Sequence, residues 1–356
     1  MAEVRPIRVA VLGTGFFGTA LATAAQQHQQ FDVIAVSDLN AESAEALATA
    51  VGARTANPRE LISCNDVDLV MVATPNHTHA ATAIELLRAG RHVFVEKPLA
   101  ITRTDVEDVL AAAHTSQGLL MVGHILRCLP GVQRLHREAT SGALGQLLEG
   151  RAVRSRLVHL PEDTADWWKL DRRRSGGELL HEIHELDLLV WIFGVPDATR
   201  CVAGATPDRP GDHAPTVHRT TMTFQNNAIA VHEVSTSAHH PEWSLRVTGR
   251  EAALVADFRT STVVKYVDGT VTEQWELFNG ASGNDSLRAA SRARQAYNAA
   301  GATTPEWMQQ AVAAELDEVA AAIHRGSSAL LAQPGTAVLT ALRAEDSDAA
   351  VPVVLT

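Results

Sequence analysis

Apolar positions follow two alternating patterns through the first third of the chain. Short runs rich in β-branched residues alternate with alanine-rich segments whose apolar residues recur at helical spacing. The strand-like runs are IRVAVL at 7–12, FDVIAVSD at 31–38, VDLVMVATP at 67–75, RHVFVEKP at 91–98 and GLLMVGH at 118–124. Strands that alternate with helices predict a parallel sheet with helices on both faces. We therefore predict an α/β domain with a doubly wound parallel sheet over residues 1–124.

The pattern changes beyond residue 124. Strand-like runs then follow one another across short polar turns such as QNN at 225–227. These runs lie at 146–160, 217–225, 228–237, 244–250, 252–258 and 261–267. Successive strands joined by short turns predict an antiparallel meander, which we place in a second, α+β domain over residues 125–356. Between about 279 and 306 the chain is polar and lacks clear periodicity, which predicts a long loop or lid.

Length and charge restrict the class of protein. The chain has 356 residues, more than the ~250–300 at which a single core stops growing, so two domains are expected. A formal net charge of −11 argues against nucleic acid or an anionic membrane as a partner. Three cysteines, Cys64, Cys128 and Cys201, are too few for a disulfide framework. The sequence lacks a signal-peptide pattern and any run near the ~18 apolar residues of a membrane span, so we expect a cytoplasmic protein.

A glycine-rich turn, GTGFFG at 13–18, follows the first strand and opens the first helical segment. This position is the one at which a GxGxxG motif binds a dinucleotide. Gly13 would permit the tight turn, Gly15 the close approach of a pyrophosphate, and Gly18 close packing of helix and strand. The phosphates would lie at the helix N-terminus, where free N–H groups favour anions. The residues expected to contact the cofactor here are Gly13, Thr14, Gly15, Phe16, Phe17 and Gly18.

An acidic residue, Asp38, ends the second strand 20 positions after Gly18. A carboxylate at this position would accept hydrogen bonds from both hydroxyls of the cofactor's ribose and would repel a 2′-phosphate. We therefore predict that the cofactor is NAD, in preference to NADP.

Polar residues also follow two later strands of the predicted sheet. The ligand crevice of such a sheet lies beyond the carboxyl ends of its strands. Lys97 is preceded by Glu96 and followed by Pro98, and a proline restricts the residue before it to extended conformations. Lys97 is therefore expected to point into the crevice. The residues predicted to line the cofactor from these two strand ends are Thr74, Pro75, Asn76, His77, Glu96 and Lys97.

Two histidines lie one turn apart in SGGELLHEIHELD at 175–187. On a helix over 178–191, His181 and His184 share one sector, and Glu182 and Glu185 occupy another. Three interpretations are open for the pair. An imidazole can accept an alcohol proton during hydride transfer. Two histidines can bind a metal if a third ligand such as His124 or His159 converges, although HEIH is one residue shorter than the HExxH of zinc proteases. Both can also be ordinary structural histidines. Proton transfer fits best, and no metal is predicted.

Taken together, these motifs resemble the glucose–fructose oxidoreductase, inositol dehydrogenase and rhizopine-catabolism (Gfo/Idh/MocA) oxidoreductase family. The resemblance rests on GTGFFG with Asp38, ATPNHTHA at 73–80, EKPLA at 96–100, GHILR at 123–127 and SGGELLHEIHELD. It is dense through residue 191 and looser afterwards. It implies a Rossmann domain followed by an α+β domain with a large, mostly antiparallel sheet, and a homodimer or homotetramer.

The resemblance also implies roles for individual residues. The family's catalytic lysine corresponds to Lys97 and its catalytic histidine to His184, which is followed by Asp187 in an H-x-x-D pattern. The aspartate that the family commonly has four residues before this histidine is absent, because Leu180 stands there. Its role would pass to His181 or be lost, which leaves the substrate class in doubt. The expected catalytic residues are Lys97, His184 and His181, and the expected substrate-binding residues are Lys97, His124, Arg127, Trp168, His181 and His184.

The predicted function is that of an NAD-dependent enzyme that oxidises a secondary ring hydroxyl of a sugar, glycoside or cyclic polyol to a ketone, or catalyses the reverse. Lys97 would stabilise the developing alkoxide while His184 accepts the proton. One alternative is a myo-inositol 2-dehydrogenase-like activity specifically. Another is a regulator that binds NAD without catalysis, and the retained Lys97 and His184 argue against it.

Overall fold

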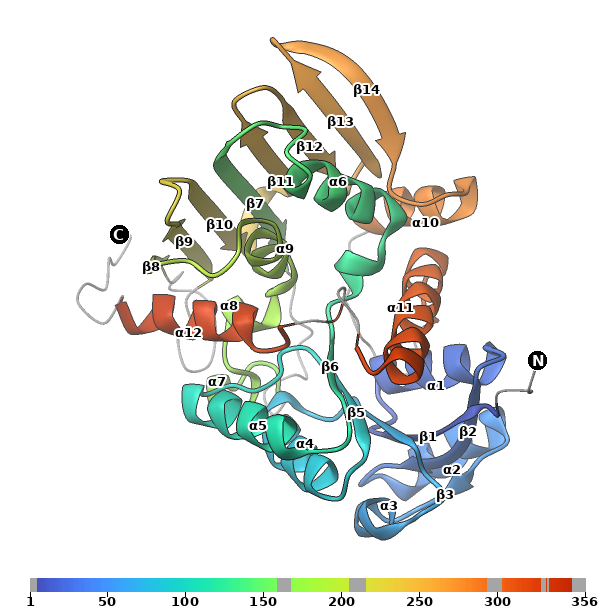
Figure 1. Cartoon of the computed structure of the whole chain (residues 1–356). Coiled ribbons are helices and arrows are strands. Elements are labelled where there is room, and N and C mark those ends of the chain that lie inside the picture. The colour runs from blue at the N-terminus through green and yellow to red at the C-terminus, as the bar shows by residue number, and fades with distance from the viewer. Residues whose placement is uncertain are drawn as a thin grey trace. The chain divides into compact units, whose positions relative to one another are not determined.

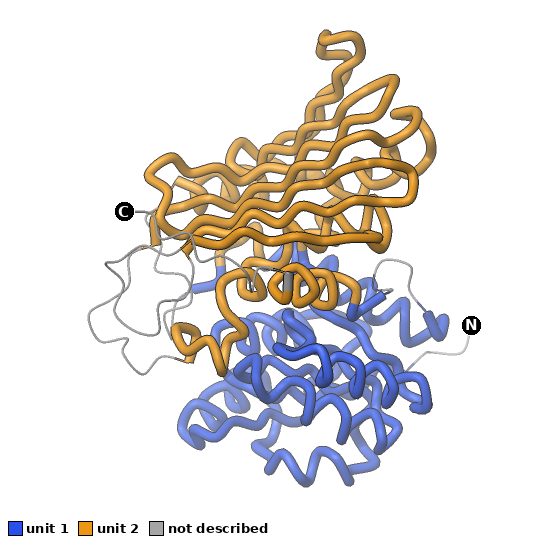
Figure 2. The backbone as a smooth tube through the Cα atoms, turned by 90° about the vertical axis from the view of Figure 1, so that its left-hand side faces the viewer, with its two compact units in different colours: residues 1–125, 297–304, 309–335 blue, residues 126–296, 305–308, 336–356 orange. Residues whose placement is uncertain are grey.

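The computed structural model consists of two compact units (Figures 1 and 2). The residues that it describes are 5–158, 168–204, 216–292, 303–327, 331 and 333–347. The first unit contains the described residues through Ile125, together with 303–304, 309–327, 331 and 333–335. The second contains Leu126 to Arg292, 305–308 and 336–347. The chain therefore returns to the first unit after it has formed the second.

The first unit is built on a six-stranded parallel sheet in the order β3-β2-β1-β4-β5-β6. The strands are β1 (Ile7–Leu12), β2 (Phe31–Ser37), β3 (Arg54–Thr55), β4 (Leu69–Val72), β5 (His92–Glu96) and β6 (Leu120–Gly123). The central strands carry apolar residues at consecutive positions because helices cover both of their faces. This confirms the predicted doubly wound parallel sheet. Strand order reverses between β1 and β4, which is the position at which sheets of this type bind their ligands, beyond the carboxyl ends of the strands.

The helices of the first unit alternate with its strands. They are α1 (Phe16–Gln27), α2 (Ala41–Val51), α3 (Pro58–Ser63), η1 (Asn76–Thr78), α4 (His79–Arg88) and α5 (Arg103–Thr115). The helix α11 (Glu306–Arg325) lies in this unit from residue 309 onwards. One contact that holds α11 there joins Asp317 to His28 at the end of α1, over 3.0 Å between Oδ1 and Nε2.

The second unit is built on an eight-stranded, mostly antiparallel sheet in the order β14-β13-β12-β11-β7-β10-β9-β8. The strands are β7 (Leu147–Leu157), β8 (Ala198–Gly204), β9 (Val217–Thr223), β10 (Ile229–Ser235), β11 (Ser237–Gly249), β12 (Ala253–Asp257), β13 (Thr262–Val267) and β14 (Thr270–Glu276). The predicted simple meander is wrong at one point. The strand β7 lies between β10 and β11 and pairs in parallel with β10. Turn residues in the sequence indicate that two consecutive strands pair. They cannot show that a strand from an earlier part of the chain lies between two later strands.

Among the residues described, three helices pack on this sheet, each on a different pair of strands. The helix α9 (His184–Phe193) packs on β7 and β10, α12 (Thr336–Ser347) packs on β8 and β9, and α6 (Pro130–Thr140) packs on β12 and β13. Shorter or more peripheral helices are η2 (Ile125–Cys128), α7 (Arg172–Ser175), α8 (Glu178–His181) and α10 (Ala281–Arg292). The loop predicted between about 279 and 306 is wrong for residues 281–292, which form α10. That helix buries few large apolar side chains, so its apolar periodicity is weak.

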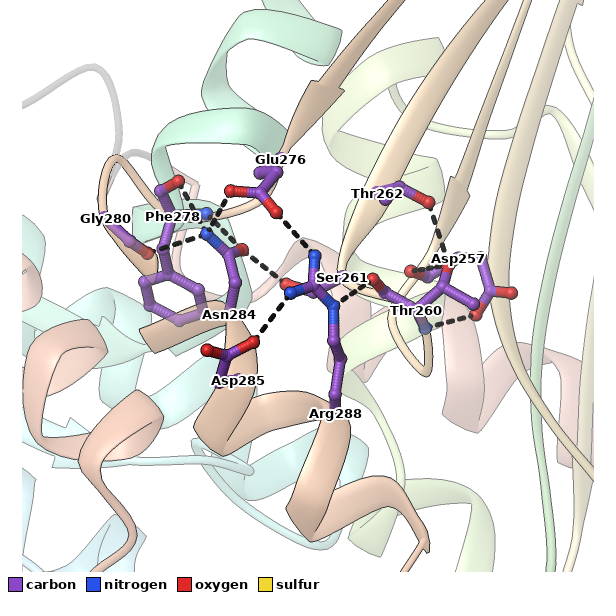
Figure 3. Close-up of polar contacts among 10 residues, drawn as sticks. All are labelled: Asp257, Thr260, Ser261, Thr262, Glu276, Phe278, Gly280, Asn284, Asp285 and Arg288. Carbon is purple, nitrogen blue, oxygen red and sulfur yellow. Dashed lines mark hydrogen bonds and ion pairs between the residues drawn. The ribbon is translucent and has the colours of Figure 1, made fainter. Parts of the chain in front are cut away.

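A buried amide, Asn284, holds α10 in place (Figure 3). Its Nδ2 group donates to the carbonyl oxygens of Phe278 and Gly280 over 3.0 and 2.8 Å, and to the Glu276 carboxylate over 2.9 Å. Its Oδ1 atom accepts from the Ser261 hydroxyl over 2.6 Å and from the Phe278 amide over 3.1 Å. One side chain therefore joins the end of β14, the first turn of α10 and the turn between β12 and β13.

We expect Asn284→Ala to destabilise the second unit by about 3 kcal/mol or more, because each buried polar group left without a partner costs about 1–3 kcal/mol. Urea unfolding measures the effect as a fall in the midpoint. Asn226→Ala is the matched control, since the exposed Asn226 side chain accepts one hydrogen bond from the Ala228 amide. Equal midpoints for the two variants would contradict the structural role of Asn284.

Candidate active site

Close packing at the GTGFFG turn leaves no room for side chains at two positions. Gly13 has a φ of +95°, and a Cβ atom there would lie 2.5 Å from the carbonyl oxygen of Ala73 in the loop after β4. A Cβ atom on Gly18 would lie 1.8 Å from the carbonyl oxygen of Gly13. Glycine is required at both positions because the backbones of β1, α1 and the β4 loop touch one another.

Gly15 differs from these two glycines, because a Cβ atom there would meet nothing within 4 Å. Gly15 is the N-cap of α1, and no side chain caps the helix. An open approach to an uncapped helix N-terminus fits a diphosphate group, which the N–H groups and the helix dipole would bind. The residues at this turn therefore fit a dinucleotide.

Asp38 lies directly after β2 and faces the glycine turn. Its Oδ2 atom accepts hydrogen bonds from the backbone amide and the hydroxyl of Thr14 over 2.7 and 2.9 Å, and Oδ1 accepts from the Asn40 amide over 2.8 Å. A carboxylate has about four acceptor positions, so about one remains for a ribose hydroxyl. The next residue, Leu39, has a fully exposed side chain at 101%.

A buried histidine joins the loops after β4 and β5. His79 begins α4, and its ring nitrogens lie 2.8 Å from the carbonyl oxygens of Pro98 and Thr74. Burial lowers the pKa of His79, and the two carbonyls oppose that shift. The ring thus fixes the loop that carries Lys97 against the loop that carries residues 74–77. The sequence carries no signal for this role of His79, because its partners are backbone atoms.

Glu96 and Lys97 stand at the carboxyl end of β5. The Glu96 carboxyl is buried, and its Oε2 atom accepts a hydrogen bond from the Lys97 amide over 3.3 Å. On its other side, a Cβ atom on Gly123 would lie 3.3 Å from Oε1, so β6 approaches closely there. Burial raises the pKa of Glu96, and the charge of Lys97 opposes the rise. The Lys97 side chain is half-buried.

The segment that carries the two histidines lies in the second unit and is not one helix. Gly176 and Gly177 have φ values of +84° and +88° and lead into α8, which ends at His181. The helix α9 then starts at His184, so the helix predicted over 178–191 is wrong at residues 182–183. The break accompanies a tertiary contact that a helical wheel does not include, because the Glu182 carboxylate pairs with Arg154 and Arg156 of β7.

His181 and His184 are the two half-exposed side chains of residues 179–190, whose other members are buried. Glu182 and Glu185 are buried. Burial raises the pKa of Glu185 to about 7, and the charge of Arg154 opposes that rise. The histidines therefore occupy the accessible side of this segment.

Asp187 and Arg127 form a buried ion pair within the second unit. The Arg127 Nε and Nη2 atoms lie 2.7 and 2.6 Å from the two carboxylate oxygens of Asp187, and the two side chains are 4% and 2% exposed. Such a two-point contact ties η2 to α9 and sets the orientation of the helix that begins at His184. Trp191 of α9 adds to this support, since its ring stacks on His136 and lies 5.3 Å from the Arg127 guanidinium carbon.

The remaining predicted site residues have separate surroundings. His124 is buried at the end of β6, and Asn76 is buried in η1. Trp168 is half-buried, with the Lys169 ammonium 5.7 Å from its ring centre. His159 lies outside the described residues. Across the described ranges, no group of three or more histidine, cysteine or acidic side chains is arranged to hold a metal ion.

Two family models match the chain in sequence. The oxidoreductase family model with an NAD-binding Rossmann fold matches residues 7–124, and the GFO/IDH/MocA C-terminal domain model matches residues 132–255. The chain belongs to the GFO/IDH/MocA oxidoreductase family. The resemblance inferred from the motifs is thereby confirmed, and residues 7–124, which form the parallel sheet of the first unit, are an NAD-binding Rossmann fold.

Two relatives of this GFO/IDH/MocA protein illustrate the range of identity and coverage. It is 26% identical to the 2,7-anhydro-N-acetylneuraminate hydratase of Escherichia coli over 87% of this chain and 84% of the relative. It is 34% identical to inositol 2-dehydrogenase 2 of Paenarthrobacter aurescens over 54% of this chain and 57% of the relative. The structure of a levoglucosan dehydrogenase with NADH and levoglucosan superposes with a TM-score of 0.78 at 22% identity, covering 97% of this chain and 98% of that one. This last similarity concerns the fold. In the described part of the chain, no helix has the length and apolar character needed to span a membrane.

Proposed function

We propose that this protein is an NAD-dependent dehydrogenase that oxidises a secondary ring hydroxyl of a sugar, glycoside or cyclic polyol to a ketone, or catalyses the reverse. The observation that carries the proposal is Lys97 at the carboxyl end of β5, in a Rossmann domain whose family is NAD-binding. The names of the relatives, which include an inositol dehydrogenase and proteins for anhydro sugars, support the substrate class.

Residues of this chain supply the positive charge that stabilises the reacting oxygen and the base that accepts its proton. Bound NAD would supply the hydride acceptor. The Lys97 ammonium stabilises the alkoxide that develops as hydride leaves, because a positive charge in a partly buried site stabilises a developing anion strongly. The His184 imidazole accepts the hydroxyl proton. His181 orients the substrate in place of the aspartate that other family members carry, and His124 and Trp168 contribute to the substrate site. Arg127, predicted to bind substrate, instead supports the site through its buried ion pair with Asp187.

A substrate panel read at the NADH absorbance tests the proposal. The panel contains myo-inositol, levoglucosan, 1,5-anhydro sugars and simple glycosides. Steady NADH formation with one of them is expected, and NAD binding without turnover on the whole panel would contradict a dehydrogenase and favour a binding protein. The hydratase name of the Escherichia coli relative favours one further assay. Conversion of 2,7-anhydro-N-acetylneuraminate without NADH accumulation would show that the net reaction is a hydration and not an oxidation.

We further propose that Asp38 makes the enzyme prefer NAD over NADP. Asp38→Asn keeps the shape and the hydrogen bonds with Thr14 but removes the charge that repels a 2′-phosphate. The ratio of kcat/KM for NAD to that for NADP should fall about tenfold or more, which corresponds to about 1.4 kcal/mol. Asp32→Asn changes an exposed carboxylate on β2, the strand that precedes Asp38, and this matched control should leave the ratio unchanged. An unchanged ratio in Asp38→Asn would assign the selectivity to other residues.

A further inference from the structure

A break in the helical backbone separates the two histidines of the second unit. The helix α8 ends at His181, and α9 begins at His184. Between them the Glu182 amide still donates to the Glu178 carbonyl oxygen over 2.9 Å, but Glu182 itself has a ψ of +42°. An α-helix requires a ψ of about −42°. Apolar residues recur at helical spacing through 178–191, so local preference does not account for the break.

The Glu182 side chain attaches this break to the sheet of the second unit. It is 7% exposed, and its carboxylate pairs with two arginines of β7. The Oε2 atom lies 3.6 Å from the Arg154 Nε atom, and Oε1 accepts a hydrogen bond from the Arg156 Nη2 group. The helix α9 packs on the same strand (Figure 1). Loss of a buried carboxylate leaves its cationic partners uncompensated, so this contact resists opening.

The two arginines are themselves held in place. The guanidinium carbon of Arg154 lies 3.8 Å from the ring centre of Trp243, its partner on the neighbouring strand β11. The Trp243 ring in turn stacks on Phe258, with 4.9 Å between the ring centres. The Arg154 and Arg156 side chains are 11% and 21% exposed, unlike the surface ion pairs that contribute little. The carboxylate is therefore bound to a preorganised support.

We propose that Glu182 is a positioning residue for both histidines. Its ion pairs with Arg154 and Arg156 hold the break between α8 and α9, and they thereby set where His181 and His184 lie relative to one another. This proposal rests on the roles proposed above for the two histidines. Proton transfer requires a base within hydrogen-bond reach of the hydroxyl group, so a small displacement of the imidazole lowers the rate strongly.

Hydrogen exchange tests the attachment without substrate or cofactor. Glu182→Gln removes the charge that compensates the two guanidinium groups. The histidine segment, residues 178–191, should then open more often, and its backbone amides should exchange about tenfold faster or more. Glu233→Gln is the matched control, because the Glu233 carboxylate also joins two arginines of this sheet. Its partners are Arg151 of β7 and Arg219 of β9, over 2.8 and 2.6 Å.

The control acts on the other face of the sheet. Successive side chains of a strand point to opposite faces, so Arg151 and Arg154 lie on different faces of β7. Glu233→Gln should therefore leave exchange in the histidine segment unchanged. If Glu182→Gln folds poorly, Arg156→Gln is the milder variant, since it keeps one of the two ion pairs, and it should accelerate exchange by a smaller factor. Unchanged exchange in the histidine segment of both variants would overturn the proposal, whether or not a sugar substrate has been found.

Catalysis provides the second readout once a substrate is known. Glu182→Gln should lower kcat by about tenfold or more, because the base is no longer held in place. In the His184→Asn background the same change should have little further effect on kcat, since a positioning residue acts through the group that it positions. A purely structural role would lower kcat by the same factor in both backgrounds, and that result would contradict the proposal.

Discussion

Lys97→Ala is expected to lower kcat/KM by about 10³-fold while NAD still binds. Removal of one preorganised group that stabilises an oxyanion costs about 10²–10³-fold in other enzymes, and Lys97 contributes a full charge. The backbone of the loop should persist, because its contacts are made by the Lys97 amide and by the Pro98 carbonyl, which His79 contacts. Initial rates with the substrate from the panel and a separate NAD titration measure the two effects.

Two variants make the Lys97 result specific. Lys265→Ala removes an ammonium that pairs with Glu138 over 2.8 Å in the second unit, and it should keep wild-type turnover. Lys97→Arg keeps the charge but changes its shape, so it should recover part of the lost rate. Full activity in Lys97→Ala would remove the lysine from the mechanism.

His184→Asn is expected to lower kcat/KM by about 10²–10⁴-fold, the range that positioned general acid–base groups contribute. The residual activity should also lose the decline at acid pH that protonation of an imidazole base causes. Asparagine fits the first position of α9 and keeps a polar group there, so the ion pair of Asp187 and Arg127 should still orient the helix. A pH profile of kcat/KM measures both effects.

The neighbouring histidine and a distant one provide the comparison for His184. His181→Asn should raise KM more than it lowers kcat if His181 orients the substrate. Binding energy that is lost equally in the ground state and in the transition state leaves kcat unchanged. His240→Asn changes an exposed histidine on β11 and should have no effect. A His184 variant whose rate and acid limb match those of the wild type would leave His181 as the candidate base.

Local patterns were sufficient for most of the parallel sheet of the first unit. The strands β1, β2, β4, β5 and β6 are apolar runs separated by helical segments, so the periodicity alone predicts their alternation. The strand β3 is polar and exposed, and α11 joins this unit from a distant part of the chain, so neither was predicted. The positive φ of Gly13 and the close approach of Gly18 to the Gly13 carbonyl require glycine at both positions. Both glycines can be read directly from the sequence. The order of the strands and the register of the second sheet are not local, which is why the parallel pairing of β7 with β10 was missed.

The candidate site likewise contains residues that local sequence motifs identify and residues that they do not. Lys97 and His184 lie in recognisable sequence motifs, because their immediate neighbours are distinctive. His79 carries no such signal, and neither does the buried Glu315 of α11. The partners of His79 are two backbone carbonyls, which any residue type could supply. The burial of Glu315 depends on how α11 packs in the folded chain.

The amino-acid sequence by itself determined the two kinds of sheet, the glycine turn with its acidic partner, and the family to which the chain belongs. Tertiary structure decided the insertion of β7, the break between α8 and α9 at Glu182, and the burial of Glu315 on α11. Periodicity and turn chemistry act over a few residues and therefore appear in the sequence. Compensation of buried charge and strand pairing depend on groups brought together only when the chain has folded.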